Sequence, residues 1–84
     1  MTSPGPEGVL KLLIEELVDN SDCVRIECNE TRGTAVIDVY VHKEDVGLVL
    51  GRGGAHAEAI RTIFKTMYHK MGKRLYLQVS ELTE

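Results

Sequence analysis

Three segments in which apolar and polar residues alternate constrain the fold more than any other feature; they span residues 23–30, 34–41 and 73–80. Alternation with a period of two is typical of a strand that buries one face. Residues 30–33 end in glycine and predict a hairpin turn, so the first two strands are expected to pair antiparallel. About thirty residues separate the second strand from the third, which is long enough for a crossover and a parallel return.

The second strand is therefore expected at the centre of a three-stranded mixed sheet, with one of the other strands on each side. The two faces of this sheet differ in polarity. One face is predicted to be buried and carries Val24, Ile26, Cys28, Ala35, Ile37, Val39, Val41, Leu75, Leu77 and Val79. The other face is predicted to meet water and carries Arg25, Glu27, Asp38, Tyr40, Tyr76 and Gln78.

Helical periodicity accounts for most of the remaining chain. Residues 7–19 place apolar residues three and four apart, and Pro6 suits a first helical turn. A short apolar segment at 46–50 follows acidic residues that favour a helix start, and a longer helix is predicted at 55–71, ending at Gly72. The predicted core residues of the helices are Val9, Leu10, Leu13, Ile14, Leu17, Val18, Ile60, Ile63, Phe64, Met67 and Met71.

Together these elements predict an α+β fold of order α-β-β-α-α-β, with three helices on one face of the sheet. Residues 1–5 are expected to be a flexible leader and residues 6–81 one domain, since 84 residues leave no room for a second. No apolar run approaches the ~18 residues of a membrane span, and no signal sequence is recognisable. We therefore expect a soluble protein of the cytoplasm.

Neither the cysteines nor the histidines predict a metal site, a disulfide or a cofactor. Cys23 and Cys28 are five residues apart and are expected on opposite faces of one strand, too far apart to bridge. No CxxC pair is present, and the histidines lack the spacing of zinc ligands. The sequence contains no nucleophile–base pair and no paired carboxylates in a predicted cleft, so we expect that the chain is not an enzyme.

Charge is unevenly distributed along the chain. The net charge is −3, yet residues 1–50 are net −6, whereas residues 51–74 carry six basic residues against Glu58 alone and are net +5. A local basic block attracts a polyanion even in an acidic protein, because the field near a surface is set by nearby charges. A solvated helix face is the alternative interpretation of such a block.

The loop Gly51-Arg52-Gly53-Gly54 joins two predicted helices. Glycine lets another backbone approach closely, and the free N–H groups and dipole at the start of the following helix favour an anion. Arg52 adds a planar donor fork that suits phosphate. These features predict a phosphate clamp without a catalytic group; a tight helix–helix turn is the alternative. The GxxxxGK[ST] loop is absent, and a dinucleotide fingerprint would need a strand before the glycines.

The residues around this loop resemble the helix–GxxG–helix unit of the K-homology (KH) domain. The resemblance rests on Asp45-Val46-Gly47-Leu48-Val49-Leu50-Gly51-Arg52-Gly53-Gly54, followed by Ala57, Ala59, Ile60 and Arg61. In that family the unit clamps the backbone of about four nucleotides of RNA. The predicted element order is similar to that of type II KH domains, and the chain resembles the small standalone KH proteins of bacteria over nearly all of residues 7–80. Gly53 and Ala55 depart from the family, which often has a basic residue directly after the loop.

The resemblance implies that RNA lies in a groove between the two motif helices and the last strand, bordered by the turn at 30–33. The candidate RNA-binding residues are Gly51, Arg52, Gly53, Gly54, Val46, Val49, Leu50, His56, Arg61 and Lys65. For the three apolar residues core packing is an equal alternative, and His56 either donates to phosphate or has no role. Arg61, Lys65 and His69 form a helical stripe whose alternative role is solubility. Tyr40 and Tyr76 are expected on the open sheet face, away from the groove.

The leading hypothesis is a type II KH domain that binds single-stranded RNA, with affinity from the loop and selectivity from the groove. One such domain engages few nucleotides, so the resemblance implies a homodimer, or a complex with a second RNA-binding protein, that gains avidity. It also implies a role as an RNA chaperone or post-transcriptional regulator. The alternative is a protein-interaction or dimerisation module with little RNA affinity, which the acidic balance favours.

Overall fold

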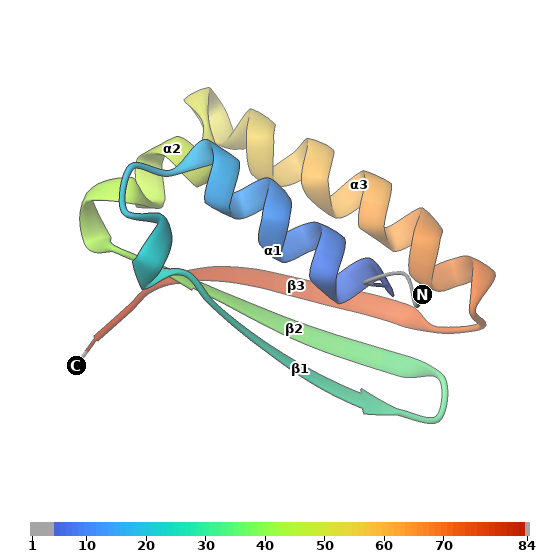
Figure 1. Cartoon of the computed structure of the whole chain (residues 1–84). Helices are drawn as coiled ribbons and strands as arrows, with labels where there is room; N and C mark the ends of the chain where they lie inside the picture. The colour runs from blue at the N-terminus through green and yellow to red at the C-terminus, as the bar shows by residue number, and fades with distance from the viewer. Residues whose placement is uncertain (1–4, 84) are drawn as a thin grey trace.

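The computed structural model describes residues 5–83, which form a three-stranded sheet and three helices that cover one of its faces (Figure 1). The element order α-β-β-α-α-β and the fold class agree with the sequence prediction. The helices are α1 (Gly5–Leu17), α2 (Val46–Leu50) and α3 (Ala55–Lys70), and the strands are β1 (Arg25–Thr31), β2 (Thr34–Val41) and β3 (Arg74–Glu81). Short 3₁₀ turns lie at Ser21–Cys23, Lys43–Asp45 and Arg52–Gly54.

Near the N-terminus the structure differs from the sequence prediction in two places. Residues 1–4 of the predicted leader lie outside the described residues, and α1 begins at Gly5, the last residue of that leader. Cys23 lies in the 3₁₀ turn before β1, so the prediction that it occupies a strand is wrong. Cys23 and Cys28 are both free thiols. No helix within residues 5–83 has the length and apolar character needed to cross a bilayer.

Strand β2 lies at the centre of the sheet, antiparallel to β1 and parallel to β3, as predicted. Gly33 closes the turn between β1 and β2 at φ 88°, a conformation that glycine adopts without steric cost. Pairing of β1 with β2 then runs without a bulge from Thr31 to Arg25. Because β2 is central, β1 and β3 are edge strands, and each has one row of backbone groups that no strand of this sheet pairs.

The core lies between the sheet and the helices. The inward-facing side chains of β2 are fully buried, because this strand has a neighbour on each side and helices above it. The core consists of Leu10, Ile14, Val18, Val24, Ala35, Ile37, Val39, Val41, Val49, Ile60, Phe64, Tyr68, Leu75 and Leu77. Burial of each large apolar side chain contributes roughly 1.5–3 kcal/mol before the entropy of ordering the chain is counted. Val9, predicted to be buried, is exposed on α1.

On α3 the buried stripe differs from the predicted one. Ile60 and Phe64 are buried as predicted, but Tyr68 continues the stripe at the next i+4 position. Ile63 is 55% exposed and Met71 is also exposed, so both predictions of core positions are wrong. Ile63 is rotated about 100° around the helix from Phe64, and Met71 follows the last helical residue.

Candidate nucleic-acid interface

The loop 51–54 connects α2 to α3 through three glycines with positive φ. Gly51 has φ 74° and ψ 173°, a region that is nearly exclusive to glycine. A Cβ at Gly51 would lie 2.5 Å from Cγ of His56 and 2.8 Å from the His56 backbone nitrogen. A Cβ at Gly53 or Gly54 would meet nothing within 4 Å. The loop is therefore closed against α3 at Gly51 and open at Gly53, where another backbone can approach.

His56 fastens the loop from the α3 side. Its Nδ1 lies 2.8 Å from the carbonyl oxygen of Leu48, one of the last four carbonyls of α2. A carbonyl only accepts hydrogen bonds, so Nδ1 carries the proton and donates it to Leu48. The sequence analysis left open whether His56 donates to phosphate or has no role; the structure engages its Nδ1 proton in holding the two helices together.

Asp45 fixes α2 at the opposite end. Its side chain is only 1% exposed and accepts hydrogen bonds from the backbone N–H of Asn20 at 2.9 Å, the Asn20 side-chain amide at 3.1 Å and the backbone N–H of Asp19 at 3.3 Å. Burial alone raises the pKa of Asp45, but these hydrogen bonds outweigh burial and hold the pKa below its usual value. The ionised carboxylate thus ties the end of the α1 segment to the start of α2, a role that the sequence analysis missed.

The three predicted apolar groove residues lie in different environments. Val49 is fully buried in the core, so the prediction that it contacts a base is wrong and the packing alternative holds. Val46 is half-buried and packs against the core. Leu50 is exposed directly before Gly51, so it remains accessible to a ligand at the loop.

A groove lies between α3 and the open edge of β3. Two hollows of about 540 and 380 Å³ share Lys65, Arg74 and Leu75 and form this β3 groove. Its polar and charged lining side chains are Arg61, Lys65, His69, Lys73, Arg74, Tyr76 and Gln78. The sequence analysis expected a groove between the two motif helices and the last strand, bordered by the turn at 30–33. The β3 groove lies between α3 and β3 with Gly33 at its border, and no residue of α2 lines it. The loop 51–54 and His56 are not among its lining residues.

The β3 groove brings together basic side chains without a carboxylate among the residues that line it. Arg61 and Lys65, both predicted, lie here on α3. Lys73 lies at the end of the groove near the β1–β2 turn, and its Nζ forms an ion pair with Oε1 of Glu30 at 2.6 Å. Nη1 of Arg61 lies 3.8 Å from Oε1 of Glu58. The groove is therefore suited to a negatively charged ligand.

The open edge of β3 adds backbone groups to the groove. The backbone N–H of Arg74 donates to the carbonyl of Gly33 at 2.9 Å, so the backbone groups of Arg74 point toward β2. Because backbone groups alternate in direction along a strand, those of Leu75 and Leu77 face the groove. The Arg61 guanidinium donates to the Leu77 carbonyl at 3.4 Å through Nε and Nη2, which confirms this direction.

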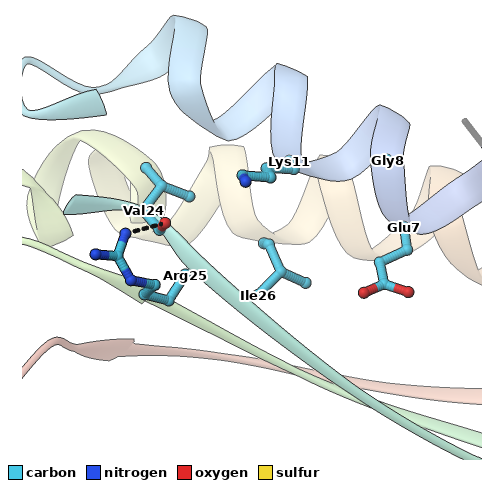
Figure 2. A pocket seen from close by; sticks show the side chains of 6 residues that line it. All are labelled: Glu7, Gly8, Lys11, Val24, Arg25 and Ile26. Atoms are coloured by element: carbon cyan, nitrogen blue, oxygen red, sulfur yellow. Dashed lines mark hydrogen bonds between the residues drawn. The ribbon is translucent and has the colours of Figure 1, made fainter. Parts of the chain in front are cut away.

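A second hollow, here named the β1 hollow, lies between α1 and β1 (Figure 2). It has a volume of about 570 Å³ and is lined by Glu7, Gly8, Lys11, Val24, Arg25 and Ile26. The Arg25 guanidinium donates to the carbonyls of Val24 at 2.9 Å and Asp22 at 3.0 Å, the first of which Figure 2 shows as a dashed line. Glu7 places an acidic side chain in the β1 hollow, and Arg25 already donates to two carbonyls. The β1 hollow therefore favours a polyanion less than the β3 groove does.

Neither the partly buried Cys28 nor the buried Tyr68 is activated for catalysis. Burial, Glu7 and Glu30 raise the pKa of the Cys28 thiol, and burial raises the pKa of Tyr68 to about 12. Both groups keep their protons at neutral pH, and a protonated thiol is a poor nucleophile. Within residues 5–83 no three His, Cys, Asp or Glu side chains gather as metal ligands.

Comparison with known proteins gives a family for this fold. The family model described as "KhpA/KhpB, KH domain" matches residues 7–79. RNA-binding protein KhpA of Aquifex aeolicus (strain VF5) is 40% identical over 75 residues, which cover 89% of this chain and 95% of that protein. RNA-binding protein KhpA of Caldanaerobacter subterraneus subsp. tengcongensis is 38% identical over 73 residues, which cover 84% of this chain and 95% of that protein. RNA-binding protein KhpA of Borreliella burgdorferi is 30% identical over 71 residues, which cover 84% of this chain and 87% of that protein.

Proposed function

The chain belongs to the KhpA/KhpB family of KH domains, a family of RNA-binding domains and not of enzymes, and we propose that it binds single-stranded RNA with loop 51–54 and the β3 groove. One observation carries the proposal: α3 begins at an open glycine loop and lines a groove of basic side chains along its length. The names of the relatives, which state RNA binding, support it.

In this proposal the loop binds the sugar–phosphate backbone. Gly53 leaves space for a close approach, and Arg52 is exposed beside it. The positive end of the α3 dipole attracts a phosphate, while the N–H of Ala55, the first residue of α3, already donates to the Arg52 carbonyl. These contacts supply affinity and fix the register of the strand, but they do not distinguish one base from another.

The β3 groove supplies contacts to the bases. The backbone groups of Leu75 and the backbone N–H of Leu77 offer hydrogen bonds to base edges, while Lys65 attracts the neighbouring phosphates. Base edges are free for such contacts only where the bases are unpaired, so the groove favours a single strand over a duplex.

A single domain of this kind contacts few nucleotides, so we infer that it gains avidity from a partner. The partner is a second copy of this chain or another RNA-binding protein, because linking two weak sites raises the affinity without new contacts at either. The proposed cellular role is that of an RNA chaperone or post-transcriptional regulator in the cytoplasm.

Substitution of Gly53 tests the proposal. Its φ of 61° and ψ of 19° lie in the left-handed region that Asn and Asp tolerate, so Gly53→Asp and Gly53→Asn should both fold. The carboxylate is expected to weaken binding of a short single-stranded RNA by at least about tenfold, because it repels phosphate, whereas the amide has far less effect. Fluorescence-anisotropy titrations at low salt measure both variants.

The matched pair makes the outcome decisive. If the Asp and Asn variants bind equally well and both show a native circular dichroism spectrum, the loop is not the phosphate site. If the wild-type chain itself binds no single strand at low salt, the protein-interaction alternative is favoured.

A further inference from the structure

Tyr76 lines the β3 groove, which contradicts the sequence prediction that it lies away from the candidate RNA site. Its side chain is 50% exposed and belongs to the open sheet face. Because β3 is an edge strand, a residue of that face also stands at the rim of the groove, beside Leu75 and Leu77. Tyr76 is the one phenylalanine, tyrosine or tryptophan among the groove's lining residues.

The electrostatic surroundings of Tyr76 suit a nucleic acid. Arg74 lies two residues before Tyr76 on β3, so the two side chains share one face of the sheet and a permanent cation lies beside the ring; Tyr76 in turn raises the pKa of Arg74. Arg61 and Lys65 line the same part of the groove from α3. Three cations therefore line the same hollow as an exposed aromatic ring, and this combination is found where proteins bind single strands without strong sequence preference.

Tyr40 provides an internal comparison on the same sheet face. The carboxylate of Glu27, partial burial and Asp38 raise the pKa of Tyr40, so its ring has acidic neighbours. In the sheet register Tyr76 pairs with Val36, four residues before Tyr40 on β2, which separates the two rings by about 13 Å along the strand. Arg25 is the cross-strand partner of Tyr40 but already donates to two backbone carbonyls, so Tyr40 offers a phosphate backbone less free positive charge than Tyr76 does.

We propose that Tyr76 is a base-stacking site: one base of a single strand held in the β3 groove turns over the edge of β3 and stacks on the exposed ring, with its phosphate toward Arg74. This inference rests on the proposed function and extends it by one base contact. Every base has a π face, so the site adds affinity with little dependence on sequence. The ring rather than the hydroxyl makes the contact. Tyr76→Phe should therefore keep the affinity within about twofold and Tyr76→Leu should lower it about tenfold.

The absence of tryptophan from the chain allows a direct test. Tyr76→Trp and Tyr40→Trp each introduce a single fluorescent indole on the same face. On titration with a short oligouridine at low salt, the indole at position 76 is expected to be quenched by stacking, and the indole at position 40 is not. An abasic strand with the same phosphates should bind without quenching either indole.

Each other outcome overturns the proposal. If Tyr76→Trp binds oligouridine with unchanged emission, or if Tyr76→Leu binds as well as wild type, no base stacks on residue 76. The binding of phosphate by the loop is tested separately by the Gly53 variants and is unaffected by that result. Equal quenching at positions 76 and 40, or quenching at position 76 by polyglutamate, would show a general response to polyanions or an acidic protein partner. If neither wild type nor the indole variants bind the strand, the proposed function fails and the stacking site fails with it.

Discussion

The two edges of the sheet differ in charge, although a helix lies beside each. At the β1 edge, the hollow below α1 mixes Glu7 with Lys11 and Arg25, and Arg25 is engaged by two backbone carbonyls. At the β3 edge, the groove beside α3 combines basic side chains, among them Lys65 and Arg74, and no acidic side chain lines it. Only the second edge offers a polyanion several cations in one place.

This difference follows from topology rather than from overall composition. Strand β1 and α1 come from residues 1–50, which are net −6, whereas α3 and the start of β3 come from residues 51–74, which are net +5. The crossover through α2 and α3 returns the chain to the side of β2 opposite β1 (Figure 1). A chain with a net charge of −3 can therefore present a basic groove, because the fold gathers its basic segment at one edge.

The largest expected effect concerns the loop at the start of α3. Gly51→Ala should lower the free energy of unfolding by on the order of 3 kcal/mol, because it combines a nearly glycine-only backbone conformation with a clash against His56. Gly54 also has a positive φ, but a Cβ there would meet open space, so Gly54→Ala should lower the free energy of unfolding by only about 1 kcal/mol. RNA affinity should fall further for Gly51→Ala than for Gly54→Ala. Urea denaturation followed by circular dichroism, together with RNA titration, measures both effects. Equal losses of stability for the two alanines would show that a Cβ at position 51 does not clash with His56.

A charge reversal on each helix tests the comparison of the two edges directly. Lys65 of the β3 groove and Lys11 of the β1 hollow are both exposed, and each Lys→Glu substitution changes the net charge by the same amount. Lys65→Glu should weaken RNA binding about tenfold, whereas Lys11→Glu should change it less than about twofold, because only Lys65 lines the groove in which the RNA is proposed to lie. Comparable losses would mean that RNA responds to total charge and that the edges do not differ in function.

The salt dependence of the same titrations refines this test. For two to four phosphates neutralised, the log–log slope of affinity against salt is expected at about −1.5 to −3, and Lys65→Gln should reduce its magnitude by about 0.7. Lys11→Gln should leave the slope unchanged.

The local sequence pattern was sufficient for the fold and for part of the site. The boundaries of β2 were predicted to the residue, because its alternation begins after the turn glycine Gly33 and ends at Val41. Residues 46–50 were predicted as a helix, but five residues are too few for periodicity to say which side is buried, so Val49 was placed in the groove. The resemblance implied a groove between both motif helices and the last strand, whereas the hollows along β3 are lined by α3 and β3 and by no residue of α2.

The contacts that the sequence analysis missed join residues without a periodic relation. His56 binds the carbonyl of a residue eight positions earlier, across the glycine loop, and Asp45 binds Asn20 from a distance of 25 residues. Tyr76 was assigned to the open face correctly, but its position at the rim of the groove depends on how α3 packs beside the edge strand. Such placements are set by tertiary packing, which no local pattern encodes.

The smallest expected effect concerns the link between the two halves of the helical layer. Asp45 connects the segment after α1 to α2, so its ionisation should couple the α1 side of the molecule to the loop. Its pKa is lowered in the folded state, so the ionised form stabilises the fold above the unfolded-state pKa, and this contribution is lost as the pH falls through the lower folded-state pKa. Asp45→Asn should therefore destabilise the protein at pH 7, and the difference from wild type should shrink in acid. The exposed Glu44→Gln is the matched control, with little effect at either pH. Urea midpoints at pH 7 and pH 3 measure both variants, and a stability difference for Asp45→Asn that is the same at both pH values would show that the carboxylate charge does not hold α2 in place.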